Sequence, residues 1–315
     1  MKISVVTPIY NEAKNVPILV MELEEVLSGT GSEYEIITIN DGSKDNSFEV
    51  LSELAKKDSH LKVVNFRNNF GQTSAISAGV DYATGDLVVL IDSDLENDPK
   101  DIPKLISKIN EGYDVVSGWR ENRWEGKFLT RKLPSICANW LISKITGLPL
   151  HDYGCILKVY KREVIEHTNL YGEMHRFIPA YAFWRGAKVT EVKVNQRRRI
   201  HGSSNYGFGR TFKVILDLVV IRFLDKYMNR PMHFFGGIGF ISLILGVIAG
   251  LSAIFLKIVH SRDFVETPLP TFSALLVIVG VQLVAMGIIA EILMRTYYES
   301  QDKKSYIIKN KINLK

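Results

Sequence analysis

The chain has 315 residues, 46% of them hydrophobic, and a formal net charge of +5 at pH 7. The apolar content is enough for a core in one large domain or two of ordinary size. The basic balance fits an anionic partner: a lipid surface, a phosphorylated substrate or a nucleic acid. Cys137 and Cys155 have the spacing of neither a metal site nor a redox motif, so we interpret both as small buried hydrophobes in a reducing compartment.

Short apolar strands and helical patterns alternate over the first third of the chain. We expect strands at residues 3–7, 35–40 and 61–66, and helices at 17–27, 46–57 and 73–83. This order predicts an α/β fold with a parallel, doubly wound sheet, whose ligands bind at the carboxyl ends of the strands. The chain has no G-x-G-x-x-G fingerprint here and no P-loop motif, which disfavours a dinucleotide enzyme and a P-loop NTPase.

The stretch LVVLIDSDLENDP, residues 87–99, reads as a buried strand over 87–92 that runs into acidic side chains. Asp92, Asp94 and Glu96 stand at every second position, which places them on one face of an extended segment. Hard oxygen ligands at a strand end suit Mg²⁺ or Mn²⁺ carrying a phosphate-bearing substrate. A solvated loop whose Asx turns cap the next helix is the alternative, and this pattern alone fits both.

Four motifs, VVTPIYNE, INDGSKDNS, NNFGQTSAISAG and LIDSDLENDP, resemble in this order the inverting family 2 glycosyltransferases of the GT-A fold. The resemblance covers residues 2–119 and implies a Rossmann-like, mostly parallel catalytic domain with a divalent metal, Mg²⁺ or Mn²⁺, held through a D-x-D. It implies that the nucleotide sugar is bound by Pro8, Tyr10, Glu12, Asp41 and Asp92, with Asp41 facing the base. Asp94 would be catalytic through the metal, which Asp92 and Glu96 would also approach.

Basic residues follow a further strand expected at residues 113–117, and their clustering leads us to expect that Arg120 and Arg131 bind the acceptor or the diphosphate. A solvated basic face is the alternative. Apolar residues then recur at helical intervals over residues 127–145, with Pro134 as a candidate kink. This stripe fits packing on the sheet and equally fits an interfacial helix at a membrane surface.

Asp152 lies in HDYGCILKVYKR, in a loop before an expected strand. This segment resembles the polyprenyl-phosphate glycosyltransferases, a subgroup of the same family, and the resemblance then extends to the C-terminus. It implies that Asp152 is a catalytic carboxylate near the acceptor, the usual candidate base. A phosphomonoester is mostly dianionic at pH 7, so Asp152 can instead orient groups without removing a proton.

The densest basic tract is QRRRIHGSSNYGFGR, residues 196–210. It resembles the R-x-x-G-x-S-x-Y segment of the subgroup, which implies that Arg199, His201 and Ser203 bind the donor diphosphate or the acceptor phosphate. A basic flank beside a membrane is the alternative. Nucleic acid is disfavoured because no nucleic-acid motif accompanies the tract.

Two nearly uncharged stretches, 234–255 and 272–294, are long enough to span a bilayer. Basic residues flank them, so the positive-inside rule puts both termini in the cytoplasm of an inner-membrane, multi-pass protein. Gly246 and Gly250 form a G-x-x-x-G that fits helix packing or oligomerisation. We expect a cytoplasmic GT-A domain at 1–209, a juxtamembrane amphipathic helix at 210–232, a two-helix transmembrane domain at 233–295 and a basic cytoplasmic tail at 296–315.

We therefore predict an enzyme that transfers one hexose with inversion, glucose from UDP-glucose, to a polyprenyl phosphate such as undecaprenyl phosphate. GDP-mannose or another UDP-sugar is the alternative donor. A processive polysaccharide synthase would carry a Q-x-x-R-W motif, which the chain lacks, and a nucleotide-binding membrane scaffold without turnover is the non-enzymatic alternative. The subgroup resemblance implies a homo-oligomer, such as a tetramer.

Overall fold

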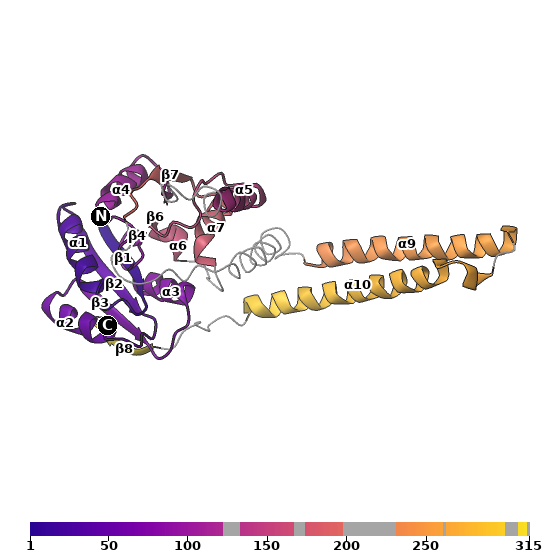
Figure 1. The fold of residues 1–315 in the computed structure, drawn as a ribbon, viewed down its shortest axis with the longest axis horizontal. Coiled ribbons are helices and arrows are strands. Elements are labelled where there is room, and N and C mark those ends of the chain that lie inside the picture. Colours follow the sequence, from indigo (N-terminus) through magenta and orange to yellow (C-terminus); the bar gives the residue numbers. More distant parts are fainter. Residues whose placement is uncertain (122–132, 167–173, 198–230, 261–262, 300–307, 314–315) are drawn as a thin grey trace. The chain divides into compact units, whose positions relative to one another are not determined.

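The computed structural model describes residues 1–121, 133–166, 174–197, 231–260, 263–299 and 308–313 (Figure 1). The chain forms two compact units, Met1–Leu218 with Lys304–Lys315, and Val219–Lys303. Arg131, Arg199, His201 and Ser203, and the amphipathic helix expected over 210–232 up to residue 230, lie outside the described residues.

The first unit is built on one eight-stranded sheet in the order β7-β5-β6-β4-β1-β2-β3-β8. Its parallel centre consists of β1 (Lys2–Ile9), β2 (Glu33–Asn40), β3 (Leu61–Phe66) and β4 (Leu87–Leu90). Towards one edge, β6 (Lys158–Lys161) runs antiparallel to both β4 and β5 (Val115–Trp119), and β7 (Val189–Lys193) pairs parallel to β5. The predicted α/β class with a mostly parallel sheet is confirmed.

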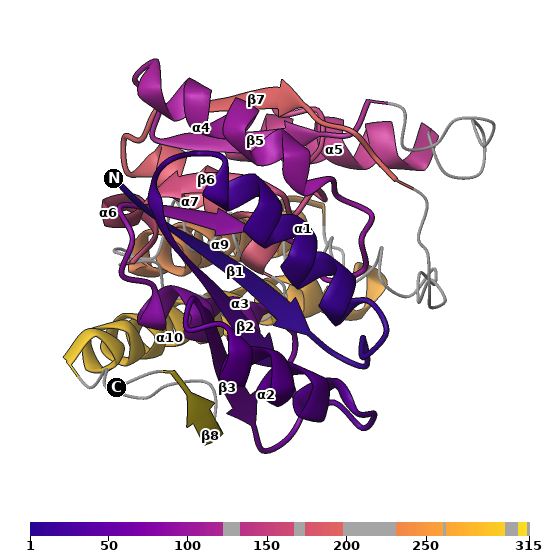
Figure 2. The ribbon, with the colours of Figure 1, turned by 90° about the vertical axis from the view of Figure 1, so that its left-hand side faces the viewer.

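Helices cover both faces of this sheet (Figure 2). Val5 and Val89 pack in one core with α1 (Val16–Ser28), α2 (Ser47–Lys57) and α4 (Ile102–Asn110). Val6 and Val88 face the other core, with α3 (Gln72–Tyr82), α6 (Arg162–Ile165) and α7 (Ile178–Trp184). Because both faces are buried, the central strands read as continuous apolar runs, which made them easy to predict.

One detail of the sheet in the first unit differs from expectation. The central strand ends at Leu90 instead of Asp92, because the chain turns there after the Ile91 N–H donates to the Val6 carbonyl at 3.1 Å. The helix α5 is described over Leu133–Thr146, and the kink predicted at Pro134 remains a prediction because the residues before Leu133 lie outside the described ranges. On this helix Cys137 is exposed, contrary to our expectation of a buried thiol.

The last described residues return to the sheet of the first unit. Strand β8 (Ile308–Ile312) pairs antiparallel with β3, and the Asn313 side-chain amide donates to the carbonyls of Ala55 at 2.8 Å and Leu61 at 2.9 Å. We expected a basic tail here. The alternation in IKNKI instead puts Ile312 against the core and leaves Lys311 exposed, a pattern too short and too basic to stand out.

The second unit is a pair of long apolar helices, α9 (Pro231–His260) and α10 (Leu269–Glu299), joined through the short 3₁₀ helix Phe264–Glu266. The segments Phe234–Val259 and Leu269–Ala290 are long and apolar enough to cross a membrane. The G-x-x-x-G motif packs within the chain, since a Cβ on Gly246 would come within 2.8 Å of Val277. The Ser273 hydroxyl also donates to the Gly246 carbonyl at 2.8 Å.

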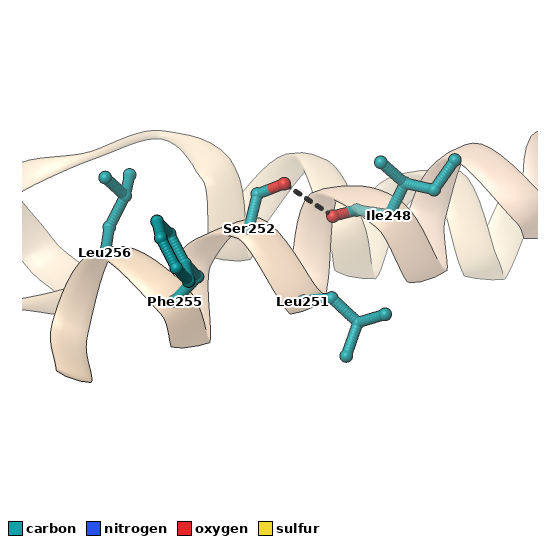
Figure 3. Close-up of a pocket in the computed structure, with 5 residues that line it drawn as sticks. All are labelled: Ile248, Leu251, Ser252, Phe255 and Leu256. Carbon is teal, nitrogen blue, oxygen red and sulfur yellow. Dashed lines mark hydrogen bonds between the residues drawn. The ribbon is translucent and has the colours of Figure 1, made fainter. Parts of the chain in front are cut away.

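A hollow on α9 is lined by Ile248, Leu251, Ser252, Phe255 and Leu256 (Figure 3). The Ser252 hydroxyl donates to the Ile248 carbonyl at 2.8 Å, within the helix itself. Since the lining carries no ionisable group, this hollow has none of the chemistry predicted from the motifs, which belongs to the first unit.

Candidate active site

The predicted site residues that the structure describes in the first unit gather where parallel strands end. Ile9 and Asn40 are in register at the carboxyl ends of β1 and β2, and Tyr10 and Asp41 follow them. The acidic stretch follows β4, and Arg120 follows β5, on the same edge of the sheet. This edge is where open α/β sheets bind ligands.

The acidic side chains after β4 share one side of their segment. Asp92, Asp94 and Glu96 are partly exposed and alternate with buried neighbours, as the spacing predicted. The segment is nevertheless a turn, because Leu95 adopts a left-handed φ of 59° while its side chain is fully buried. The Asp94 carboxylate accepts the Glu96 N–H at 3.1 Å, which ties the turn together.

The pKa of the Asp92 carboxyl group is strongly raised at this edge. The Gln72 side-chain amide, at the start of α3, donates to its Oδ1 at 2.7 Å. Burial, together with the negative charge of Asp94, raises the pKa of Asp92 to about 7, and the positive charge of Arg120 opposes this rise. The turn therefore holds carboxylates together against their mutual repulsion.

These residues fit a divalent cation that arrives with a substrate. Within the described ranges, no three His, Cys, Asp or Glu side chains stand close enough to hold a metal by themselves. Mg²⁺ needs no such cage, since it is usually bound by one or two carboxylates, several waters and substrate phosphates. Burial and the negative charge of Asp94 both disfavour the ionised form of Asp92, and a cation bound at this turn would stabilise that form.

Arg120 and Asp152 form a buried ion pair across the site. Arg120 Nε donates to Asp152 Oδ2 at 2.8 Å and Nη2 donates to Oδ1 at 3.1 Å, while the Gly154 N–H donates to Oδ1 at 3.0 Å. Both side chains are under 10% exposed. The sequence suggested separate roles for these two residues, and the structure brings them together as one bidentate unit.

A buried lysine beside this pair was not predicted from the sequence. Lys158, on β6, is 1% exposed, and its ammonium donates to the carbonyls of Tyr153 and Cys155, in the turn that carries Asp152. Burial lowers the pKa of Lys158 to about 8, and the charges of Asp152 and Asp92 oppose this effect. The available signal was a lone lysine inside the apolar strand pattern CILKVY.

The residues expected to bind the nucleotide lie at the ends of β1 and β2. Pro8 is buried opposite Ile39, and Tyr10 is exposed. The Glu12 carboxylate accepts from the Asn15 amide at 2.5 Å. These residues remain predictions as nucleotide ligands, and their positions at the carboxyl edge are compatible with that role.

The Asp41 carboxylate binds backbone N–H groups of a neighbouring loop. It accepts the N–H groups of Phe70 at 2.7 Å and Gly71 at 2.9 Å, which lead into α3. Burial raises its pKa and these two N–H groups counteract the rise. Asp41 thereby fixes the loop that places Gln72 against Asp92, and its contact with a nucleotide base stays a prediction.

The basic tract begins against the acidic turn. The Arg197 N–H donates to the Glu96 carbonyl at 2.9 Å, and its guanidinium binds Glu22 of α1 at 2.7 Å and Asp98 at 2.5 Å. The Gln196 amide donates to the Glu96 carboxylate at 3.1 Å. The chain therefore enters residues 198–210 from a point fixed beside the candidate metal ligands.

Comparisons with known proteins agree with this geometry. The profile of the family described as Glycosyl transferase family 2 matches residues 4–168. The chain is 40% identical to a dodecaprenyl-phosphate galacturonate synthase of Rhizobium johnstonii, over 98% of this chain and 92% of that protein. It is 35% identical to an undecaprenyl-phosphate 4-deoxy-4-formamido-L-arabinose transferase of Klebsiella pneumoniae, over the same shares.

Among solved structures, glucosyl-3-phosphoglycerate synthase from Mycobacterium tuberculosis, in complex with Mn²⁺ and UDP-glucose, resembles this chain with a TM-score of 0.55. The two sequences are 17% identical, and the match covers 70% of this chain and 78% of that one. This likeness bears on the fold, and it agrees with a GT-A arrangement of the sheet.

Proposed function

The chain belongs to glycosyl transferase family 2, and from this premise we propose that it transfers one sugar from a nucleotide sugar to the phosphate of a membrane-bound polyprenyl phosphate. One observation carries the proposal. The turn with Asp92 and Asp94, which could bind a cation together with a diphosphate, lies on the same sheet edge as the buried pair of Arg120 and Asp152. Relatives that match over nearly their whole length carry polyprenyl phosphates in their names.

The proposed reaction is a direct displacement at the anomeric carbon. An oxygen of the acceptor phosphate forms a bond to that carbon on one face, and the bond to the nucleoside diphosphate breaks on the other, which inverts the configuration. The acceptor phosphate is already mostly dianionic at pH 7, so no strong base is required. We assign Asp152 and Arg120 to positioning of the acceptor phosphate, because each holds the other in place.

The donor side of the site needs charge neutralisation. A bound Mg²⁺ or Mn²⁺ would neutralise the diphosphate and make it a better leaving group. Asp94 and Asp92 would hold that ion, and Glu96, fixed by Gln196, lies within the same turn. Arg131, Arg199, His201 and Ser203 are proposed to bind donor or acceptor phosphates, as the subgroup resemblance implies.

The identity of the transferred sugar is a separate part of the proposal. From the sequence we predicted glucose from UDP-glucose. The relatives named above carry galacturonate and 4-deoxy-4-formamido-L-arabinose in their names. A donor panel therefore has to include a uronic acid and an amino-pentose nucleotide beside UDP-glucose and GDP-mannose.

A membrane hairpin with both ends on one side is the proposed topology. The strand β8, which follows α10 in the chain, pairs with β3 of the unit that precedes α9. A chain that leaves this unit through one span has to return through the other to the side it left. The basic flanks of the two spans favour the cytoplasm as that side.

The proposal is tested with purified full-length protein, Mg²⁺, the donor panel and two matched acceptors, undecaprenyl phosphate and undecaprenol. Mass spectrometry of the lipid fraction identifies the product. We expect a lipid-phosphate sugar with one donor and no product from undecaprenol, because the phosphate is the nucleophile. Glycosylation of undecaprenol, or long glycan chains on either lipid, would contradict the proposal.

A further inference from the structure

The first turn of α3 is bonded to two carboxyl groups of the candidate site. The Gly71 N–H donates to the Asp41 carboxylate at 2.9 Å. The side-chain amide of the next residue, Gln72, donates to Asp92 at 2.7 Å. The geometry at Asp92 therefore depends on where this turn is held.

The third residue of the turn is bonded to a distant part of the chain. Thr73 Oγ1 and His175 Nδ1 form a hydrogen bond of 2.7 Å, although the two residues are 102 positions apart. Thr73 is 4% exposed and His175 is 2% exposed. Because an unpaired polar group costs free energy when it is buried, this bond holds the two side chains together in the folded protein.

His175 itself is placed by a well-packed segment. It lies in the short 3₁₀ helix Met174–Arg176, and Phe177 and Ile178, which follow, are both fully buried. Ile178 begins α7 and packs in the same core as Ala75 of α3. The histidine is thus fixed by its own surroundings, and the bond to Thr73 passes this position on to the first turn of α3.

We propose that His175 is a positioning residue of the donor side of the site: its Nδ1 fixes Thr73, and the first turn of α3 then holds the Gln72 amide against Asp92. The consequence for catalysis rests on the proposed function, in which Asp92 belongs to the donor side. A displacement of about 1 Å at such a group can slow a reaction roughly 100-fold, because the reacting atoms have to be held in a productive geometry.

The first experiment measures the turn without any substrate. Hydrogen–deuterium exchange of the purified full-length protein, followed by mass spectrometry of peptides that cover residues 70–76, reports the opening of this turn. Thr73→Val removes the hydroxyl at nearly constant size and should speed exchange at least tenfold. Thr73→Ser keeps the hydroxyl and should exchange as the wild type does. Unchanged exchange in Thr73→Val would overturn the inference.

Two replacements of His175 separate its hydrogen bond from its size. Asparagine places its amide at the position of Nδ1, where it can donate or accept, whereas the larger glutamine places its amide at the position of Nε2. We expect His175→Asn to exchange at the wild-type rate and His175→Gln to behave as Thr73→Val. The reverse order would assign the effect to packing and would refute the role of Nδ1.

Kinetics measure the consequence for the reaction. Thr73→Val and His175→Gln should each lower donor kcat/KM at least tenfold and leave the acceptor KM unchanged, while His175→Asn restores most of the rate. The double variant should lose no more than either single variant, because both replacements remove the same bond. Additive losses would mean that the two residues act separately, contrary to the inference.

Thr38→Val is the matched control for the loss of a buried hydroxyl. Thr38 on β2 is 1% exposed, and its hydroxyl donates to the Lys62 carbonyl at 3.1 Å. Its replacement should lower the melting temperature about as much as Thr73→Val does, with no change in exchange over residues 70–76 or in donor kcat/KM. An equal kinetic loss in Thr38→Val would show that reduced stability alone explains the effect.

The outcomes separate this inference from the proposed function. If the wild-type protein transfers sugar from no donor of the panel, the proposed function fails, whereas the exchange data still decide whether His175 holds the turn. If the wild-type protein is active and both Thr73→Val and His175→Gln keep full donor kcat/KM, His175 has no positioning role in the reaction.

Discussion

Arg120 and Asp152, 32 positions apart in the sequence, meet as a bidentate ion pair that excludes most solvent. The pair engages both oxygens of the carboxylate that the subgroup resemblance assigns as a base. A carboxylate held in this way is better suited to fixing an arginine than to accepting a proton. We therefore propose that Asp152 orients the Arg120 guanidinium in the site.

The first prediction concerns this pair. Asp152→Asn and Arg120→Met should each lower transfer roughly 100-fold and destabilise the protein by about 3 kcal/mol, because each leaves a buried partner without its counter-charge. The double variant Arg120→Met with Asp152→Leu should regain much of the stability and none of the activity. Thermal unfolding and initial rates measure the two effects, and near-normal turnover of Asp152→Asn would rule out an essential carboxylate.

The second prediction follows from the raised pKa of Asp92. A folded pKa of about 7, above the ordinary value of 3.8, stabilises the protein below pH ~4, and this contribution is lost as the pH rises through about 7. In EDTA we expect lower thermal stability at pH 8 than at pH 5.5, by at most about 1.4 kcal/mol for each pH unit. Mg²⁺ should restore more stability at pH 8.

Asp92→Asn provides the control for this titration. The variant removes the group, so both the stability difference between pH 5.5 and pH 8 and the added effect of Mg²⁺ at pH 8 should shrink. An unchanged pH dependence would assign it to another group.

The third prediction tests the metal ligand that the motif implies. Asp94→Asn should lower the rate of metal-stimulated transfer roughly 10²–10³-fold, while the protein remains folded in the membrane. Asp98→Asn is the matched control from the same stretch and should keep metal-stimulated transfer. The Asp98 carboxylate already binds Arg197 at 2.5 Å and the Lys100 N–H at 3.0 Å. Full metal-dependent activity of Asp94→Asn would exclude Asp94 as a ligand.

The fourth prediction concerns the buried cation. Lys158→Met should keep the fold, since methionine fills the same space, but release the turn that carries Asp152 and lower kcat roughly 10- to 100-fold with little change in donor KM. Lys158→Arg should restore part of the rate. Lys161→Met, on the same strand and paired with Asp114 at 2.7 Å, should behave as wild type. An equal loss in Lys161→Met would assign the effect to the strand.

Much of the fold was predictable because its physical causes are local. The strands β1 to β4 are buried on both faces, so each appears as a short apolar run between helical patterns. Strand β8 was missed because only five residues, IKNKI, form it, and its partner β3 lies some 250 positions earlier in the chain. Pairing at such a distance leaves no local signal.

Single residues of the site could be predicted from the sequence, whereas the contacts between them could not. The alternation of Asp92, Asp94 and Glu96 gave the correct exposed side, although the left-handed Leu95 makes the segment a turn. The pairing of Arg120 with Asp152 depends on β6 entering the sheet antiparallel between β4 and β5, which no motif encodes. Lys158 was not predicted because its partners are backbone carbonyls of a turn, which no side-chain motif indicates.

The most direct measurement is the transfer of radiolabelled sugar into an organic-extractable lipid by the purified protein, with undecaprenyl phosphate, Mg²⁺ and each donor of the panel, with and without EDTA. We expect an acid-labile glycolipid that forms with one donor, requires the lipid phosphate and disappears in EDTA. Bound nucleotide with no labelled lipid from any donor would contradict it and would favour a membrane protein that binds nucleotides without turnover.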